Sequence, residues 1–460
     1  MTTLSGLSRI PRGQEKLSQV TSIVEQLQKD ITEKAFSISE QTKLLEELKI
    51  LGRDPQNADP IFTKDGITLL AAYGFERKNQ EALRCLANAM FLKPQARKLF
   101  LDKGLAPTAI GLLKSRDFDD QFLISRILFL LTYESKTDFT SLDKDGILSD
   151  AIPTDLRQHA QRYAEVGRQP SDTAIEEMAL CELLKLTFNL THFHPSFVPS
   201  LSSSIPDLFD ILRSLQGLDP PMKPPANLAV NALLNLVGEG NEDQNSIIFP
   251  EDSPSLNSST LLDLLQQVTG PQDASGLEDV LPSLLTLLRK IYKIAPESVK
   301  QDFHTWLLPS DSERDQPLGR SGSLPARLLQ LSASSLSEQT RLSISAMLFE
   351  LSGEDASRFI KNIGYGYAAG FLLAQKIDVP AELLEASETE DGDSVPINPI
   401  TGQRLDAEPA VAGPPMTDEE KEREAERLFV LFERLRQTGV VDVRNPVAQA
   451  LEEGRFEELE

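Results

Sequence analysis

Six stretches of this sequence are apolar on nearly every side of a helix, and this feature most restricts how the chain can fold. Apolar residues recur at three- and four-residue spacing within each stretch, which predicts α-helices rather than strands. A helix that is apolar all round must be buried on more than one side. The six stretches are residues 81–92, 122–133, 178–191, 226–237, 280–294 and 340–351. A seventh, residues 37–51, places Leu44, Leu45, Leu48 and Leu51 on one stripe.

Four of these helices share a register. Asn88, Asn189 and Asn235 each follow an apolar residue by five positions, and Leu130 takes the same place in the fourth helix. The steps between these positions are 42, 59 and 46 residues. Repeats of about 40–47 residues with two or three helices are typical of armadillo and HEAT arrays. Since one such unit cannot cover its own apolar faces, we expect an all-α superhelix of stacked armadillo/HEAT-type repeats.

Composition sets the class of protein. With 460 residues the chain has room for about three domains or one long array. Apolar residues make up 40%, enough for a large core. Cys85 and Cys181 lie in apolar helices without a CxxC partner, so we expect neither a disulfide framework nor a thiolate zinc site. Without a signal-like N-terminus or an 18-residue apolar run, we expect a soluble cytoplasmic or nuclear protein.

Charge is distributed unevenly along the chain. The net charge is −24, which argues against a protein that wraps a nucleic-acid backbone. Residues 1–133 hold 19 basic and 16 acidic residues, whereas residues 382–460 hold 8 basic and 21 acidic ones. We therefore expect different roles for the two ends of the chain.

The predicted domains follow from these patterns. Residues 1–384 form the repeat array, residues 385–416 an acidic flexible linker, and residues 417–460 a C-terminal amphipathic helix and tail. Thr417 and Glu420 have the form of a capping box at the start of that helix. Its apolar stripe comprises Leu428, Leu431, Phe432 and Leu435. Within the array, residues 134–175, 238–259 and 308–325 are polar and are expected to be loops.

Signatures of catalysis are missing from the sequence. Gly364–Gly370 reads GxGxxxG, one residue too long for a dinucleotide fingerprint, and indicates close packing or a tight turn instead. The sequence has no P-loop pattern. His192 and His194 have no evident third metal ligand, so a loop or helix-end pair is expected there. We predict a protein that is not an enzyme and that holds no cofactor or metal.

The repeat helices carry a polar stripe that could bind a partner. Four residues before each key Asn lies another polar side chain, on the same helix face. The resulting pairs are Arg84/Asn88, Lys185/Asn189 and Asn231/Asn235, with Arg126 at the equivalent place in the fourth helix. Amides and guanidiniums in a concave groove can bond a partner's carbonyls or carboxylates. The alternative is that the Asn side chains tie adjacent repeats together through loop carbonyls.

Several segments resemble a known family. They are EALRCLANAMF (81–91), SRILFLLTY (125–133), LLKLTFNLT (183–191), SLPARLLQL (323–331), NIGYGYAAGFL (362–372), NPITG (398–402) and residues 416–447. Together, and in this order, they resemble the synembryn family, with this chain as a fungal-like member. The family comprises cytosolic exchange factors and chaperones of heterotrimeric G-protein alpha subunits.

The resemblance implies a function and a partner. A member of this family binds the GDP-bound, nucleotide-free or nascent alpha subunit, displaces its C-terminal helix, and stabilises the nucleotide-free state until GTP binds. The guanine nucleotide is bound by the alpha subunit, so no cofactor is expected here. A monomeric, cytoplasmic protein is implied, recruited to the plasma membrane through the alpha subunit without membrane insertion. The alternative function is an armadillo-type peptide-binding scaffold without exchange activity.

The resemblance also implies site residues. Groove candidates for the alpha subunit's C-terminal helix are Arg84, Asn88, Arg126, Lys185, Asn189 and Asn235. Candidates for the GTPase domain, on the C-terminal helix, are Leu428, Phe429, Leu431, Phe432 and Leu435. Ser387 and Thr389 are the nearest candidates for phosphorylation in the acidic linker.

Overall fold

The computed structural model divides the chain into two compact units, residues 1–403 and 404–460. The described residues are 11–114, 117–135, 137–165, 174–217, 219–238, 242–270, 276–379, 396–408, 417, 421, 423 and 427. Across these ranges the regular secondary structure consists of helices, without a β-strand. The prediction of an all-α protein is confirmed.

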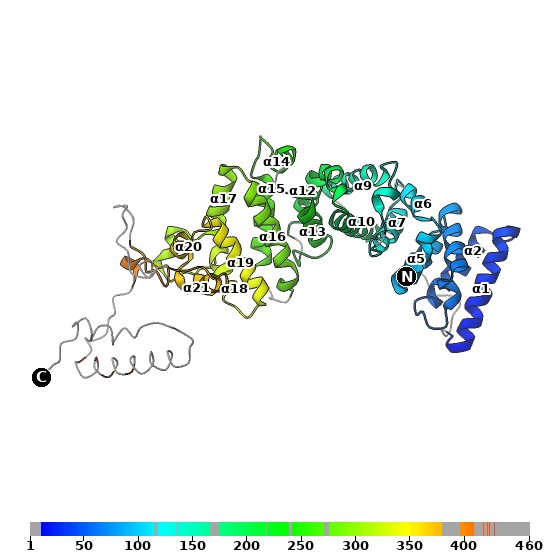
Figure 1. The fold of residues 1–460 in the computed structure, drawn as a ribbon, viewed down its shortest axis with the longest axis horizontal. Coiled ribbons are helices and arrows are strands. Elements are labelled where there is room, and N and C mark those ends of the chain that lie inside the picture. Colours follow the sequence, from blue (N-terminus) through cyan, green and yellow to red (C-terminus); the bar gives the residue numbers. More distant parts are fainter. Residues whose placement is uncertain are drawn as a thin grey trace. The chain divides into compact units, whose positions relative to one another are not determined.

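The first unit is built from helix pairs. In each pair the second helix belongs to a row that we call the ladder. The ladder helices are α2 (Ile38–Leu51), α4 (Gln80–Leu92), α7 (Phe118–Leu131), α10 (Ala174–Phe193), α13 (Ala226–Leu236), α16 (Leu277–Ile294) and α19 (Glu338–Leu351). Each ladder helix packs on the next one in this order (Figure 1). All seven stretches singled out by their apolar pattern are ladder helices.

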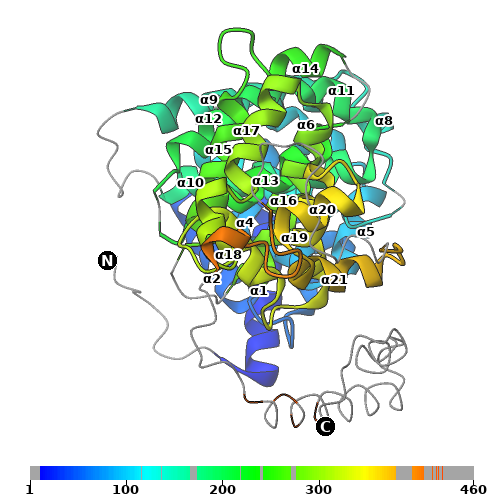
Figure 2. The ribbon, with the colours of Figure 1, turned by 90° about the vertical axis from the view of Figure 1, so that its left-hand side faces the viewer.

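The first helix of each pair forms a back row. These helices are α1 (Gly13–Glu33), α3 (Lys64–Ala71), α6 (Ala106–Leu112), α9 (Ile147–Ala164), α12 (Ile205–Ser214), α15 (Leu256–Val268) and α18 (Leu324–Ser332). Each packs on the ladder helix of its own pair. In Figure 2, α9, α12 and α15 lie above α10, α13 and α16. Two stacked rows of helices give the predicted armadillo/HEAT-type superhelix.

Shorter helices connect or end the pairs. The connecting α-helices are α5 (Pro94–Asp102), α8 (Phe139–Leu142), α11 (Val198–Leu201), α14 (Glu242–Ile248) and α17 (Glu297–Leu307). The array ends with α20 (Ala356–Ile363) and α21 (Tyr365–Ala374). Residues 59–62, 195–197, 202–204, 311–315 and 405–407 form 3-10 turns, and residues 72–76 form a π turn.

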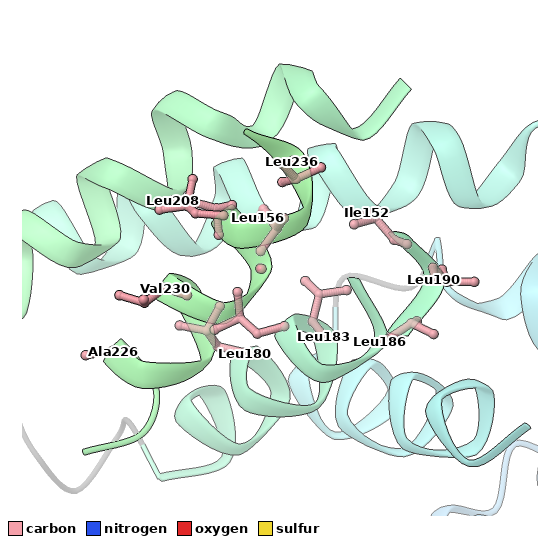
Figure 3. Packing of buried hydrophobic residues seen from close by; sticks show 14 of the residues in the cluster. Ile152, Leu156, Leu180, Leu183, Leu186, Leu190, Leu208, Ala226, Val230 and Leu236 are labelled. Carbon is pink, nitrogen blue, oxygen red and sulfur yellow. The ribbon is translucent and has the colours of Figure 1, made fainter. Parts of the chain in front are cut away.

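The core lies between the two rows. Figure 3 shows its middle, where side chains of α9 and α12 meet those of α10 and α13. Leu156, Leu180 and Leu208, from three of these helices, are fully buried. Burying one such side chain contributes about 1.5–3 kcal/mol. Because α10 meets apolar neighbours on several sides, its sequence is apolar nearly all round.

Side-chain caps fix where four of the ladder helices begin. Ser37 and Glu40 form a capping box at the start of α2. Asn79, Asp117 and Ser337 accept hydrogen bonds from the first-turn amides of α4, α7 and α19. Such a cap contributes about 1 kcal/mol.

All three expected loops contain more structure than the sequence indicated, and residues 238–259 hold α14 and the start of α15. Residues 134–175 were predicted to be a polar loop, but they hold the 18-residue helix α9. An internal proline, Pro153, and a mixed polar pattern hid that helix. In the expected loop 308–325, Arg314 is buried and donates to the carbonyl oxygens of Asn362 and Gly402, at 3.0 Å each. The segment 308–325 is therefore packed against the end of the array.

A segment placed in the linker by the sequence packs on the end of the array. The amides of Tyr365 and Gly366 donate to the carbonyls of Pro399 and Ile400, at 2.7 and 3.0 Å. A Cβ at Gly364, where φ is +80°, would lie 2.9 Å from the Ile400 oxygen. Gly364 therefore serves close packing, one of the two roles expected for this glycine run. Residues 396–403 belong to the first unit.

The described residues of the second unit are few. The carbonyl of Thr417 accepts a hydrogen bond of 3.0 Å from the amide of Lys421, as a helix beginning at Thr417 requires. The remaining candidates in this region lie outside the described residues: Ser387, Thr389, Leu428, Phe429, Leu431, Phe432 and Leu435.

Candidate partner-binding site

Three neighbouring ladder helices present matching half-exposed stripes. Positions three, four and seven residues apart lie on one face of a helix. The stripes are Arg84, Asn88 and Phe91 on α4; Arg126, Phe129 and Tyr133 on and just beyond α7; and Lys185, Phe188 and His192 on α10. We call these nine residues the ladder face. It contains four of the six predicted groove residues.

Carboxylates hold the cations of the ladder face in place. Arg84 donates to Glu81 at 2.6 Å and pairs with Asp119 of the next ladder helix. Arg126 and Lys185 both donate to one oxygen of Glu182, at 3.0 and 2.9 Å. Since one carboxylate serves two cations there, positive charge is left over for a partner.

Cations and aromatic rings interleave across the ladder. The Arg126 guanidinium lies 5.7 Å from the ring centroid of Phe91 on the preceding ladder helix. The Lys185 ammonium lies 6.0 Å from the ring of Phe129 in the same way. In both α7 and α10, therefore, the cation lies over an aromatic ring of the preceding ladder helix. Such contacts contribute about 0.5–1 kcal/mol at exposed sites and fix both partners in position.

Exposed aromatic side chains also belong to this region, although the sequence did not predict them as site residues. Phe91 is 61% exposed, Tyr133 55% and Phe193 51%. The ring of His192 stacks on Phe188, with centroids 5.7 Å apart, and lies edge-on to Phe193. The signal in the sequence was an aromatic residue seven positions after Arg84 and Arg126, and three after Arg126 and Lys185.

The two other predicted groove residues tie helices together. Asn189 is buried, and its Nδ2 donates to Thr132 Oγ1 at 2.7 Å. Asn235 of α13 donates to the Phe188 carbonyl at 3.0 Å and to Thr191 Oγ1 at 3.2 Å. These contacts match the alternative that the sequence left open, in which the Asn side chains link adjacent repeats.

Asn88 and Asn231 differ from these two. Both are half-exposed, and neither side chain makes a hydrogen bond to any described part of the chain. A half-exposed amide offers two donors and an acceptor to the backbone of a partner. Asn88 is therefore the amide best placed to meet a ligand on the ladder face.

Nucleophilic chemistry is disfavoured on this face. Burial raises the pKa of the Cys181 thiol, near Lys185, to about 12, so the thiol stays protonated at neutral pH. The His194 ring packs 5.4 Å from that of Phe139, and burial lowers its pKa. Among the described residues no group of three His, Cys, Asp or Glu side chains is placed to hold a metal. No helix in the described ranges combines the length and apolar character needed to cross a bilayer.

The arrangement suits binding. Exposed rings offer apolar contact, the Arg126–Lys185 pair offers excess positive charge, and Asn88 offers backbone hydrogen bonds. Aromatic and Arg side chains are the types that carry most of the energy in protein interfaces. An amphipathic helix that carries carboxylates fits this face.

This chain is similar in sequence to several known proteins. A synembryn-like chaperone of Schizosaccharomyces pombe is 25% identical over 378 residues, covering 76% of this chain and 68% of that protein. The chaperone Ric-8A of Macaca fascicularis is 26% identical over 462 residues, and that of Bos taurus 27% over 458; each match covers 89% of this chain and 84% of the relative. An engineered protein of known structure matches with a TM-score of 0.41 at 16% identity, over 60% of this chain and 97% of its own, which is too weak to bear on the fold.

The family model described as guanine nucleotide exchange factor synembryn matches residues 44–455. This range includes the ladder face and all six predicted groove residues, together with the C-terminal segment that carried much of the resemblance. The chain belongs to the synembryn family of guanine nucleotide exchange factors.

Proposed function

We propose that the ladder face binds the C-terminal helix of a heterotrimeric G-protein alpha subunit, and that this contact is the basis of nucleotide exchange and chaperoning. Membership in the family makes the chain an exchange factor and chaperone for alpha subunits. The observation that supports the ladder face as the contact is its row of exposed rings interleaved with cations, from Phe91 to Lys185.

Exchange follows from linkage. The C-terminal helix of the alpha subunit supports the loop that holds the guanine ring. A protein that binds this helix only when it is displaced favours the nucleotide-free state, and GDP affinity falls by the same factor. A coupling of about 1–3 kcal/mol changes affinity only 5–150-fold. Emptying a tight GDP site requires more, so we propose two contact regions acting together.

The second contact is the C-terminal helix of this chain. We assign to it the apolar residues Leu428, Phe429, Leu431, Phe432 and Leu435, which would engage the GTPase domain. Rebinding of GTP then expels the exchange factor. Preference for the nucleotide-free alpha subunit also stabilises the nascent one by mass action, which makes the same surface a chaperone site.

Further parts of the proposal concern state and place. The chain acts as a cytoplasmic monomer, reaches the plasma membrane through the alpha subunit, and makes or breaks no covalent bond. It needs no cofactor of its own, because the nucleotide belongs to the alpha subunit. Phosphorylation at Ser387 or Thr389 strengthens activity.

The test is GDP release from a purified alpha subunit loaded with fluorescent GDP. The full chain accelerates release, and removing the last residues of the alpha subunit abolishes the acceleration. A Leu431→Asp/Phe432→Asp variant binds less tightly while keeping its helical content. Binding that leaves the rate of release unchanged would contradict exchange, and acceleration of the truncated alpha subunit would contradict the role of its C-terminal helix.

A further inference from the structure

An open groove lies at the far end of the ladder, between α19 and α21. It has a volume of about 600 Å³. Its apolar floor comprises Leu342, Ala346, Phe349, Phe371 and Ile377. We call it the α19–α21 groove, and it shares no residue with the ladder face.

The floor of this groove rests on a packed cluster of three aromatic rings. The ring centroid of Phe349 lies 5.3 Å from that of Phe371 and 5.3 Å from that of Phe359. The centroids of Phe359 and Phe371 lie 5.8 Å apart. Phe359 and Phe371 are buried beneath the surface, whereas Phe349 is half-exposed. A ligand would therefore meet a preformed apolar surface, and little side-chain order would be lost on binding.

The rim of the groove is acidic. Glu350 accepts hydrogen bonds from Arg289 at 3.0 and 2.5 Å, and Lys293 lies 3.8 Å from it. Glu338 and Glu354 also line the groove, and neither forms an ion pair with a described residue. Two carboxylates beside an apolar floor thus remain available to a ligand.

We propose that the α19–α21 groove binds a basic amphipathic segment of a protein partner. Apolar side chains one helical turn apart would fill the floor, and flanking Lys or Arg side chains would pair with Glu338 and Glu354. The same carboxylates repel an anionic membrane surface. They also repel the acidic end of this chain, whose residues 382–460 carry a net charge of −13.

This preference is the opposite of that at the ladder face. There, Arg126 and Lys185 share the single carboxylate of Glu182. Here, three carboxylates line the groove with one guanidinium among them, and the Lys293 ammonium lies 3.8 Å from one of the three, Glu350. The array therefore offers two docking sites of opposite charge, and the second does not depend on the function proposed above.

The test uses the full chain and two labelled peptides of equal length. Both carry Leu at three- and four-residue spacing, with Lys at the other positions in one peptide and Glu in the second. We expect the Leu–Lys peptide to bind, as measured by fluorescence anisotropy, and the Leu–Glu peptide not to bind at this groove. Glu338→Lys/Glu354→Lys should lower the affinity for the Leu–Lys peptide at least tenfold.

The control variant separates this site from the attraction of a chain with net charge −24. Glu25→Lys/Asp102→Lys changes the net charge equally at two exposed positions outside the groove and should leave binding intact. Leu342→Gln, at a half-exposed floor position, should weaken binding without changing the charge. Equal weakening by both charge variants, no effect of Leu342→Gln on the Leu–Lys peptide, or equal weakening of the Leu–Glu peptide by Leu342→Gln would overturn the proposal.

Discussion

Asn189 of α10 donates its side-chain amide to Thr132 Oγ1 at the end of α7, across a distance of 2.7 Å. The bond joins two adjacent ladder helices where both side chains are buried. A repeat array is stabilised by contacts between neighbouring repeats, so a polar contact at this place fixes how two repeats stack. A side chain that the sequence suggested for a partner is used inside the molecule.

Replacing Asn189 should therefore lower stability more than replacing Asn88 does. Asn189→Ala removes a buried hydrogen bond, and we expect it to lower the free energy of unfolding by about 1–3 kcal/mol. Asn88→Ala is the matched control, because the Asn88 side chain is half-exposed and bonds to no described residue. Urea denaturation followed by circular dichroism measures both. Equal midpoints would show that the Asn189 bond is not needed for stacking.

The exposed rings of the ladder face should matter for binding rather than for folding. Phe91→Ala/Tyr133→Ala removes two largely exposed rings, and we expect at least a tenfold loss of alpha-subunit affinity with little change in thermal midpoint. Calorimetric titration against a GDP-loaded alpha subunit measures the affinity.

Leu256→Ala provides the matched control for these rings, because Leu256 is an exposed apolar residue on the back row. Its affinity should equal that of the unchanged chain. The role of the ladder face is refuted if the Leu256 variant loses as much affinity as the ring variant.

The pattern of apolar residues was enough to find the ladder helices, because burial on several sides leaves only a narrow polar stripe on each. It could not find α9, where Pro153 interrupts a mixed pattern. It also could not place residues 396–403, whose packing depends on backbone hydrogen bonds to Tyr365 and Gly366. Backbone contacts between distant segments leave little trace in side-chain periodicity.

For the site, the register of Arg84, Arg126 and Lys185 was visible in the sequence, since helical spacing fixes which side chains share a face. The split between the amides was not. Asn88 and Asn189 occupy the same register, yet one is half-exposed and the other bonded between helices. That difference arises because the end of α7 places a hydroxyl, Thr132, beside Asn189, and only the packing of the two helices shows it.

A buried carboxylate near the N-terminus should be among the more sensitive positions in the array. Asp30 accepts hydrogen bonds from the Tyr73 hydroxyl at 2.7 Å, the Phe36 amide at 2.7 Å and the Arg77 guanidinium at 2.6 Å. Burial alone would raise the pKa of Asp30, but these donors outweigh it and hold the pKa below its usual value. Arg77→Met leaves the Asp30 carboxylate without its ion pair, and we expect the free energy of unfolding to fall by about 3–5 kcal/mol.

The pH dependence of the Asp30 contribution has a definite sign. A depressed pKa contributes stability above the unfolded-state pKa of about 3.9 and loses it as the pH falls through the folded-state value. The difference in unfolding free energy between the chain and its Asp30→Asn variant should therefore be constant from pH 6 to 8 and shrink below pH 4. Chemical denaturation at each pH measures it, and a difference that grows on acidification would contradict the assignment.

Asp155 of α9 should show the opposite behaviour. It is buried, its Oδ2 has no hydrogen-bond partner among the residues that the structure describes, and burial raises the pKa of this carboxyl to about 7. Between pH 4 and 7 the folded chain holds a proton that the unfolded chain has lost, so the Asp155 contribution to stability falls as pH rises through this window. Three pKa units correspond to about 4 kcal/mol at most.

Asp155→Asn removes the charge, so we expect it to raise the thermal midpoint clearly at pH 8 and only slightly at pH 5. Asp102→Asn, at an exposed position, should change nothing at either pH. A gain from Asp155→Asn that is equal at both pH values would mean that the pKa of Asp155 is not raised in the folded chain.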